Sequence, residues 1–295
     1  MQSLDLIKKR ISIVRDVQKI TSSMKLVAAA KSRKLINNFA STKSFYNDFY
    51  SIIFSLVSSI PQSTFKRRAE NNKSSKALWV VICSSLGLCG GFNANITRDV
   101  VNNIGNNDDI ILIGNKGEAL LKAKGLKERI IQVIDISDRE SQYLEIIPLC
   151  TLISQKFAAG EYKTVNIEYT RYINSLKSVP THKKILPIDK DVFVDSSVEV
   201  KYKDTILSEE GKVIQFEPGP LSILDNSTIV FLSTVIQAAV AESKVSENTT
   251  RMNNMQAATD NANDLIATLT LKYNKLRQEQ ITQEINEIVQ GAGSE

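Results

Sequence analysis

The stretch ALWVVICSSLGLCGGFN, Ala77–Asn93, decides the fold of the middle of the chain. An apolar run rich in valine runs straight into a turn that contains three glycines, and helical spacing begins at Asn93. Short runs of this kind are typical of buried strands in a parallel sheet. We therefore predict a strand, a tight turn and a helix. Phosphate-binding loops begin in the same way, so the turn has to be tested as a nucleotide site.

The same alternation continues along the chain. Further strands are predicted at DIILIG, RIIQVI and YKTVNIEYT, and helices at residues 93–104, 116–124 and 141–159. Strands that alternate with helices indicate a parallel sheet with helices on its faces. We predict a Rossmann-like α/β domain over residues 75–190, with connecting segments at 61–76 and 191–220.

Helix breakers are absent from both ends of the chain. All six prolines and ten of the twelve glycines lie between Pro61 and Pro220. Because proline costs about 3 kcal/mol and glycine about 1 kcal/mol inside a helix, residues 1–60 and 221–290 are each predicted to form one long helix. Helices of this length far exceed the width of a small domain and need a partner along their length.

Apolar residues recur at steps of three and four in both terminal runs, the narrow stripe of a coiled coil. Residues 1–60 carry a net charge of +7 and residues 221–295 a net charge of −4, which favours pairing of the two ends in an antiparallel coiled coil. The predicted seam consists of Leu4, Ile7, Ile11, Val14, Val17, Ile20, Met24 and Val27 in the first helix and Met255, Ala258, Ala262, Leu265, Leu269, Tyr273 and Leu276 in the last, where it continues through Ile281, Ile285 and Ile288.

The seam has one gap, ESKVSENTTRMNN, residues 242–254, where only Val245 and Met252 are strongly apolar. Two interpretations stay open. The gap is either a local irregularity of the coiled coil, or the helix faces a different partner there.

The glycine turn fails both phosphate-binding patterns. GLCGGFN lacks the lysine and hydroxyl residue of a Walker loop, and GxGxxG is also absent. Tight packing is the simpler interpretation. The single histidine, His182, is expected in a surface loop, and no HExxH, CxxC or GxSxG motif is present. We therefore expect no catalytic residues, no cofactor and no metal site, and conclude that the chain is not an enzyme on its own.

Composition excludes little else. No run of 18 apolar residues predicts a transmembrane helix, and the N-terminus lacks the features of a signal peptide. Three cysteines without metal-ligand spacing fit a reducing, cytoplasmic compartment. The basic first helix leaves open a stand-alone coiled-coil protein that binds nucleic acid, although the helix lacks interleaved aromatic residues.

The chain resembles the gamma subunit of F-type ATP synthases from end to end. The N-terminal match is IKKRISIVRDVQKITSSMKLVAAAKSRK, and SSLGLCGGFN resembles the strand-to-helix turn of that family. TTRMNNMQAATDNANDLI and YNKLRQEQITQEINEIVQGA resemble its C-terminal signature, which is highly specific.

This resemblance implies a central rotor shaft that couples rotation to ATP synthesis or hydrolysis. In that family the antiparallel coiled coil inserts into a ring of three alpha and three beta subunits. The α/β domain lies at the foot, with an epsilon-like subunit, on a membrane-embedded c-ring through which ions flow. The resemblance further implies a peripheral protein on the cytoplasmic face of a bacterial membrane, with no cofactor and no nucleic acid.

The resemblance also implies contact sites rather than catalytic ones. Met24 and Arg251 match the region that couples the shaft to a moving beta subunit. Arg277 and Gln278 match the pair that contacts a beta-subunit catch loop, with Thr282 and Glu284 one turn later. The residues from Ile281 to Val289 are expected to sit in a bearing formed by the ring.

Several residues depart from the family pattern. Ser85 and Leu86 replace an acidic and a basic residue, Lys25 replaces a glutamate, and Thr249 and Thr250 replace alanines. These changes leave open an alternative, the rotor of a divergent F-type-like ATPase that drives a process other than ion translocation.

Overall fold

The computed structural model describes residues 4–136, 142–193 and 216–292, which fall into two compact units. One unit comprises residues 1–31 and 251–295, here called the coiled-coil unit, and the other comprises residues 32–250, here called the sheet unit. Helices α1 (Leu4–Ser59) and α7 (Pro220–Ala292) each contribute to both units. The prediction of two long terminal helices is confirmed.

The sheet unit is built on five strands in the order β3-β2-β1-β4-β5. The strands are β1 (Ala77–Ile82), β2 (Asp109–Ile113), β3 (Ile130–Ile134), β4 (Thr164–Tyr172) and β5 (Ser178–Leu186). The first four run parallel, as the Val/Ile-rich runs predict, whereas β5 pairs antiparallel with β4 at the edge of the sheet.

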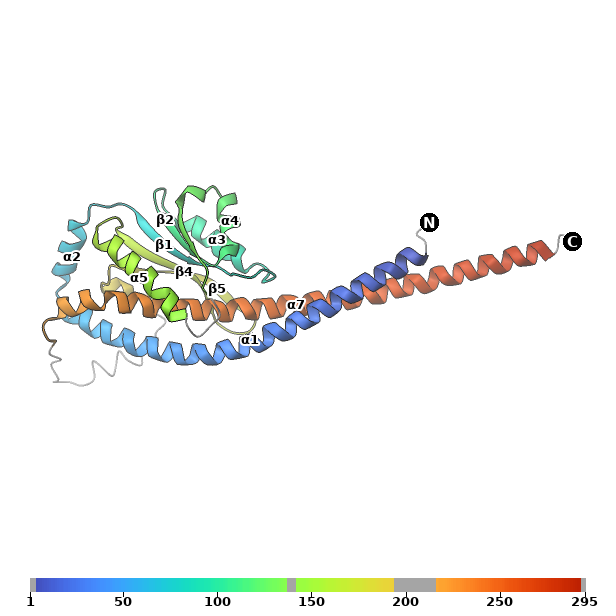
Figure 1. Ribbon diagram of the computed structural model, residues 1–295, viewed down its shortest axis with the longest axis horizontal. Helices are drawn as coiled ribbons and strands as arrows, with labels where there is room; N and C mark the ends of the chain where they lie inside the picture. The colour runs from blue at the N-terminus through green and yellow to red at the C-terminus, as the bar shows by residue number, and fades with distance from the viewer. Residues whose placement is uncertain (1–3, 137–141, 194–215, 293–295) are drawn as a thin grey trace. The chain divides into compact units, whose positions relative to one another are not determined.

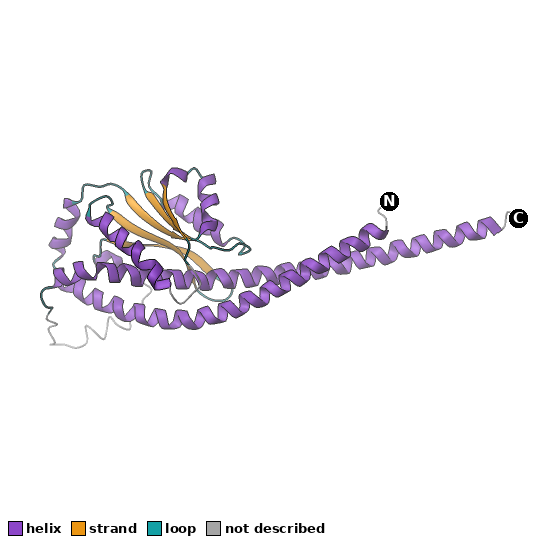
Figure 2. Cartoon of the chain, viewed as in Figure 1, coloured by secondary structure: helices purple, strands orange, loops and turns teal. Residues whose placement is uncertain are grey.

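Helices cover both faces of this sheet (Figure 2). On one face α3 (Phe92–Asn103) and α4 (Glu118–Ala123) bury Trp79, Val81 and Leu112. On the other face α5 (Gln142–Ala158) packs with the sheet-unit parts of α1 and α7 in the larger core, which contains Val80 and Phe231. This is the α/β architecture that the alternation of strands and helices predicts.

Two parts of the described chain are more regular than the sequence predicts. Helix α2 (Gln62–Asn71) lies within the segment 61–76, and its Arg68 forms a bidentate pair with Asp225. His182 lies on β5 rather than in a surface loop. Short 3-10 helices at Asn115–Gly117, Lys127–Arg129 and Lys190–Phe193 complete the described elements, and residues 194–215 of the predicted connecting segment 191–220 lie outside the described part.

The polar gap in the α7 seam faces a different partner, the edge of the sheet. The amide of Tyr172 donates to the Glu242 carboxylate at 3.1 Å, and the Ser246 hydroxyl donates to the carbonyl of Thr170 at 3.3 Å. Ser32 on α1 and Thr249 join their hydroxyl groups at 2.9 Å. Serine and threonine here pair with backbone and hydroxyl groups, so an apolar residue would leave those groups unsatisfied. The interpretation as a local irregularity is therefore wrong.

In the coiled-coil unit α1 and α7 run antiparallel (Figure 1), with Ile7 and Ile11 packed against Leu269 and the hydroxyl groups of Thr21 and Thr259 2.8 Å apart. The seam continues to the buried Ala28. The predicted seam is wrong at three positions of α1, because Val17, Ile20 and Val27 are exposed. It is also wrong at Leu265 of α7, which is 42% exposed, and at its continuation through Ile281, Ile285 and Ile288, which are exposed as well.

Small and hydroxyl side chains occupy part of the seam instead: Thr21 is half-buried, and Ala28 and Thr259 are buried. Periodicity identifies helix faces but does not tell which of two adjacent faces is buried.

By length and composition alone, α7 is also apolar enough to cross a membrane, but half of its most apolar window is buried within the protein. The α7 side chains Phe231, Leu232, Ile236 and Val240 belong to the larger core of the sheet unit. Packing inside the protein therefore accounts for the apolar character of this helix.

Candidate rotor contact surface

Four of the six residues that the sequence singles out lie together at the C-terminal end of α7. Arg277, Gln278, Thr282 and Glu284 are all exposed, and so is every other side chain from 277 to 289. The last α7 residues that pack against α1 are Tyr273 and Leu276. Beyond them α7 continues as a single helix to Ala292, past the first helical residue of α1 (Figure 1). We call residues 277–292 the tip.

An apolar stripe runs along the tip. Ile281, Ile285 and Ile288 recur at steps of four and three, and are 43%, 54% and 70% exposed. Residues at these steps share one face of a helix. By the same geometry Arg277 and Glu284 flank the stripe on one side, and Gln278 and Thr282 flank it on the other. The tip is therefore an amphipathic helix whose apolar face has no partner within the described residues.

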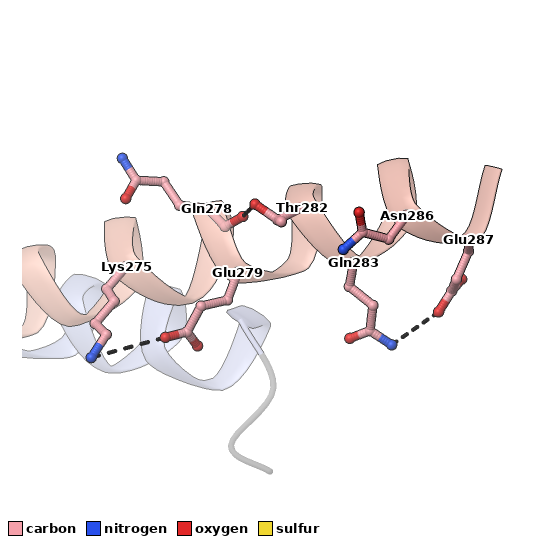
Figure 3. Close-up of a pocket in the computed structure, with 7 residues that line it drawn as sticks. All are labelled: Lys275, Gln278, Glu279, Thr282, Gln283, Asn286 and Glu287. Atoms are coloured by element: carbon pink, nitrogen blue, oxygen red, sulfur yellow. Dashed lines mark hydrogen bonds and ion pairs between the residues drawn. The ribbon is translucent and has the colours of Figure 1, made fainter. Parts of the chain in front are cut away.

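The polar face of the tip is held by contacts between successive turns (Figure 3). The Thr282 hydroxyl donates to the backbone carbonyl of Gln278 at 2.8 Å, and the Gln283 amide donates to Glu287 at 2.9 Å. These side chains border a shallow depression whose seven lining residues all belong to α7. A depression formed by one helix encloses nothing, so it is not a pocket for a small molecule.

Met24 and Arg251 lie elsewhere in the coiled-coil unit. Met24 is half-buried on α1, whereas Arg251 is only 6% exposed and already has interaction partners within the chain. The structure therefore does not bring these two residues together with the four at the tip. Arg251 presents little surface of its own.

Sequence reasoning missed a second exposed apolar stripe, which lies on α1. Leu6, Ile13, Val17, Ile20 and Val27 recur at steps of seven, four, three and seven, and each is 48–60% exposed. Residues at these steps lie on one face of α1, and this face is next to the face buried in the seam. The sequence contains this apolar stripe, but the predicted seam includes Val17, Ile20 and Val27 among its buried residues. Both helices of the coiled-coil unit thus carry apolar side chains that face away from their pairing surface.

The glycine turn is closed by its own side chains. Asn93 accepts from the amide of Ser84 at 2.9 Å and donates to the Ser84 hydroxyl at 2.7 Å, and both residues are buried. The turn that follows β2 packs closely against this one, since a Cβ atom on Gly114 would lie 2.3 Å from the carbonyl oxygen of Cys83. The turn therefore serves packing, in agreement with the failed Walker pattern.

Comparison with known proteins gives the architecture a family. The family model described as "ATP synthase" matches residues 3–294. The "ATP synthase gamma chain" of Malacoplasma penetrans is 36% identical over 300 residues, covering 100% of both chains. The chain belongs to the ATP synthase gamma-chain family. The gamma chain of Clostridium botulinum is 35% identical over 97% of this chain and 96% of its own length.

Solved structures share the fold at lower identity. The rotor of the Euglena gracilis mitochondrial ATP synthase matches with a TM-score of 0.66 and 18% identity, over 94% of this chain and 98% of that one. A chain of the Tetrahymena thermophila central stalk and c-ring matches with a TM-score of 0.58 and 21% identity, over 81% and 99%. Gamma chains form the central stalk of the F-type enzyme and are non-catalytic, so the expectation of a rotor subunit is confirmed.

Proposed function

We propose that this gamma chain turns inside a ring of three alpha and three beta subunits and transmits its rotation through the tip of α7. The observation that carries the proposal is the amphipathic, unaccompanied tip. Apolar side chains exposed along a single helix are costly in water and mark a surface that another protein covers. A sheath formed by surrounding subunits would cover this stripe while still allowing the helix to turn.

Within this proposal the polar flanks of the stripe make the specific contacts. Arg277 and Gln278 engage a beta-subunit loop, and Thr282 and Glu284 continue the contact one turn later. Arginine is favoured at such positions because its planar guanidinium forms bidentate bonds with carboxylates. Met24 and the α1 stripe are assigned to the same moving interface, and Arg251 to its support from within the coiled coil.

The remaining parts follow the domain division predicted from the sequence. Residues 1–60 and 221–290 form the shaft, residues 75–190 form the foot domain, and residues 191–220 connect them. We propose that the foot binds an epsilon-like subunit and a membrane c-ring. The chain is then a peripheral protein on the cytoplasmic face of a bacterial membrane.

The test is reconstitution of the chain with its alpha and beta subunits. Replacing Arg277 and Gln278 together by alanine should lower rotation-linked ATP hydrolysis at least about fivefold, the effect of losing one hot spot of about 1 kcal/mol. Gln283 and Glu287 provide the matched control, because they lie on the opposite face of the same helix. Their double alanine variant should hydrolyse ATP at the wild-type rate. Equal rates for both variants and the wild type would rule out the tip contact.

The departures from the family pattern keep one alternative, the rotor of a divergent ATPase without an ion-conducting ring. In the glycine turn, Leu86 and Leu88 are 55% and 58% exposed. The family usually has an acidic residue at the position of Ser85 and a basic residue at the position of Leu86. Native mass spectrometry of the intact complex distinguishes the two. One copy with three alpha chains, three beta chains and c-ring chains supports the synthase, whereas the same hexamer with other companions supports the divergent motor.

A further inference from the structure

Three side chains from separate elements of the sheet unit converge at the edge of the sheet. Strand pairing places His182 of β5 directly opposite Glu168 of β4, and α3 packs over both strands with Asp99 facing them. The Nδ1 atom of His182 is 3.3 Å from an Asp99 carboxylate oxygen and 4.0 Å from a Glu168 oxygen. One donor atom from each residue lies within 4.8 Å of the other two.

Glu168 is the unusual member of this cluster. Its side chain is fully buried, and neither carboxylate oxygen has a hydrogen-bond partner among the residues that the structure describes. A buried carboxylate without donors is among the most costly groups in a protein interior. A nearby lysine of β5, Lys184, does not resolve the problem, because its ammonium group pairs with Asp189 at 2.8 Å.

The donor set has the chemistry of a divalent metal site. Once a bound ion has displaced the Glu168 proton, two carboxylates and a neutral imidazole supply two negative charges and three ligand atoms, which matches one divalent cation. Ligand bonds of about 2.0–2.2 Å in a tetrahedron separate the ligand atoms by about 3.3–3.6 Å. The distance of 3.3 Å between His182 and Asp99 lies in this range, and the distance of 4.0 Å between His182 and Glu168 is slightly longer. The imidazole favours zinc and its neighbours over magnesium, which prefers oxygen ligands alone.

The cluster is open to solvent on one side. The side chains of Asp99 and His182 are 33% and 49% exposed, whereas Glu168 forms the floor. An ion can therefore enter from the surface, and water can complete its coordination. Three protein ligands with one open position are typical of zinc sites that retain a water molecule.

We propose that Asp99, Glu168 and His182 bind a divalent transition metal ion of the Zn²⁺ class. The ion supplies the cation that the Glu168 carboxylate lacks. It also joins α3 to the antiparallel β4–β5 edge of the sheet, where the His182–Asp99 contact at 3.3 Å already links the two elements. Its role is structural, and it stands apart from the rotor contacts of α7.

The chain provides its own reporter for this site. Trp79 is the only tryptophan, and its ring centroid lies 6.0 Å from that of His182. Paramagnetic Co²⁺ bound at His182 should quench Trp79 fluorescence strongly, whereas diamagnetic Zn²⁺ should displace Co²⁺ and restore the emission. His182 is the only histidine of the chain. The full-length chain has to be purified without a polyhistidine tag, because such a tag would itself bind Co²⁺ and Zn²⁺.

Co²⁺ titration of the chelator-treated chain should give saturable quenching at one ion per chain, reversed by Zn²⁺ but not by excess Mg²⁺. Asp99→Asn and His182→Ala should each weaken Co²⁺ binding at least about tenfold. Both change half-exposed side chains, so unchanged circular dichroism will verify folding. Glu128→Gln removes an exposed acidic side chain from the same unit and should leave the titration unchanged.

Zn²⁺ should also raise the melting temperature of the wild-type chain but not of Asp99→Asn. Quenching that never saturates, or that is equally strong in His182→Ala, would overturn the proposal. Binding lost when all three cysteines are replaced by alanine, but kept in both ligand variants, would overturn it as well.

Discussion

Asp108 allows the stability of the sheet unit to be tested through one buried carboxylate. It directly precedes β2, is only 8% exposed, and accepts three hydrogen bonds. The donors are the amide of Ala77 at 2.9 Å, the indole Nε1–H of Trp79 at 3.0 Å and the amide of Gly105 at 2.8 Å. The carboxylate thus joins the start of β1 to the start of the loop between α3 and β2.

Replacing Asp108 by alanine removes all three bonds at once. A hydrogen bond to a charged group contributes about 1.5–3 kcal/mol, but bonds that share one carboxylate are not additive. The free energy of unfolding should therefore fall by about 3–5 kcal/mol in Asp108→Ala. Asp108→Asn keeps one acceptor oxygen and should lose roughly half as much.

The assay is urea unfolding of the full chain, followed by circular dichroism and by the fluorescence of Trp79. Asp225→Asn is the matched control, because Asp225 forms an exposed pair with Arg68 that should contribute less than about 1 kcal/mol. A loss below about 1 kcal/mol in Asp108→Ala, or equal losses in Asp108→Ala and Asp225→Asn, would refute the reasoning.

Three further outcomes follow from burial. Burial raises the pKa of Cys150 to about 12 and raises that of Cys83 as well, so a thiol reagent at pH 8 should label neither cysteine until the chain is denatured; rapid labelling of the native chain would contradict this. Burial, reinforced by the nearby Asp99 carboxylate, raises the pKa of Glu168 to about 9. In the metal-free chain, stability should therefore fall as the pH rises from the unfolded-state value towards 9, by up to about 1.4 kcal/mol per pH unit. Glu168→Gln should flatten this slope, and an unchanged slope would contradict the assignment. Leu269→Ala should destabilise the coiled-coil unit by about 2–4 kcal/mol, whereas the exposed Leu271→Ala should change it by less than about 0.5 kcal/mol; similar losses in thermal unfolding would argue against the seam.

Sequence patterns predicted the elements that rest on strong local preferences. The Val/Ile-rich runs gave the parallel strands, and the absence of breakers gave α1 and α7, because both signals are large compared with tertiary effects. Strand β5 was missed because it contains proline and five polar or charged residues, which an antiparallel edge strand tolerates. Its identification requires β4, the strand that it pairs with.

The candidate surface was predictable only in part. The family resemblance identified the residues of the tip. Their exposure depends on how far along α7 the packing against α1 extends, which the sequence does not tell. The cluster around His182 could not be predicted, because its members come from a helix and two strands whose register is set by tertiary packing. Asp99 and Glu168 are separated from His182 by 83 and 14 residues, and no local spacing connects them.

The unaccompanied tip also has a consequence for the supply of subunits in the cell. Its side chains from 277 to 289 are all exposed, so unwinding its last turns exposes little additional surface and costs little free energy. Helix ends of this kind are preferred sites of proteolytic attack. A chain outside its complex therefore offers proteases a substrate that an assembled chain conceals. Surplus copies should be degraded first, which would keep the number of gamma chains matched to the number of rings that can receive them.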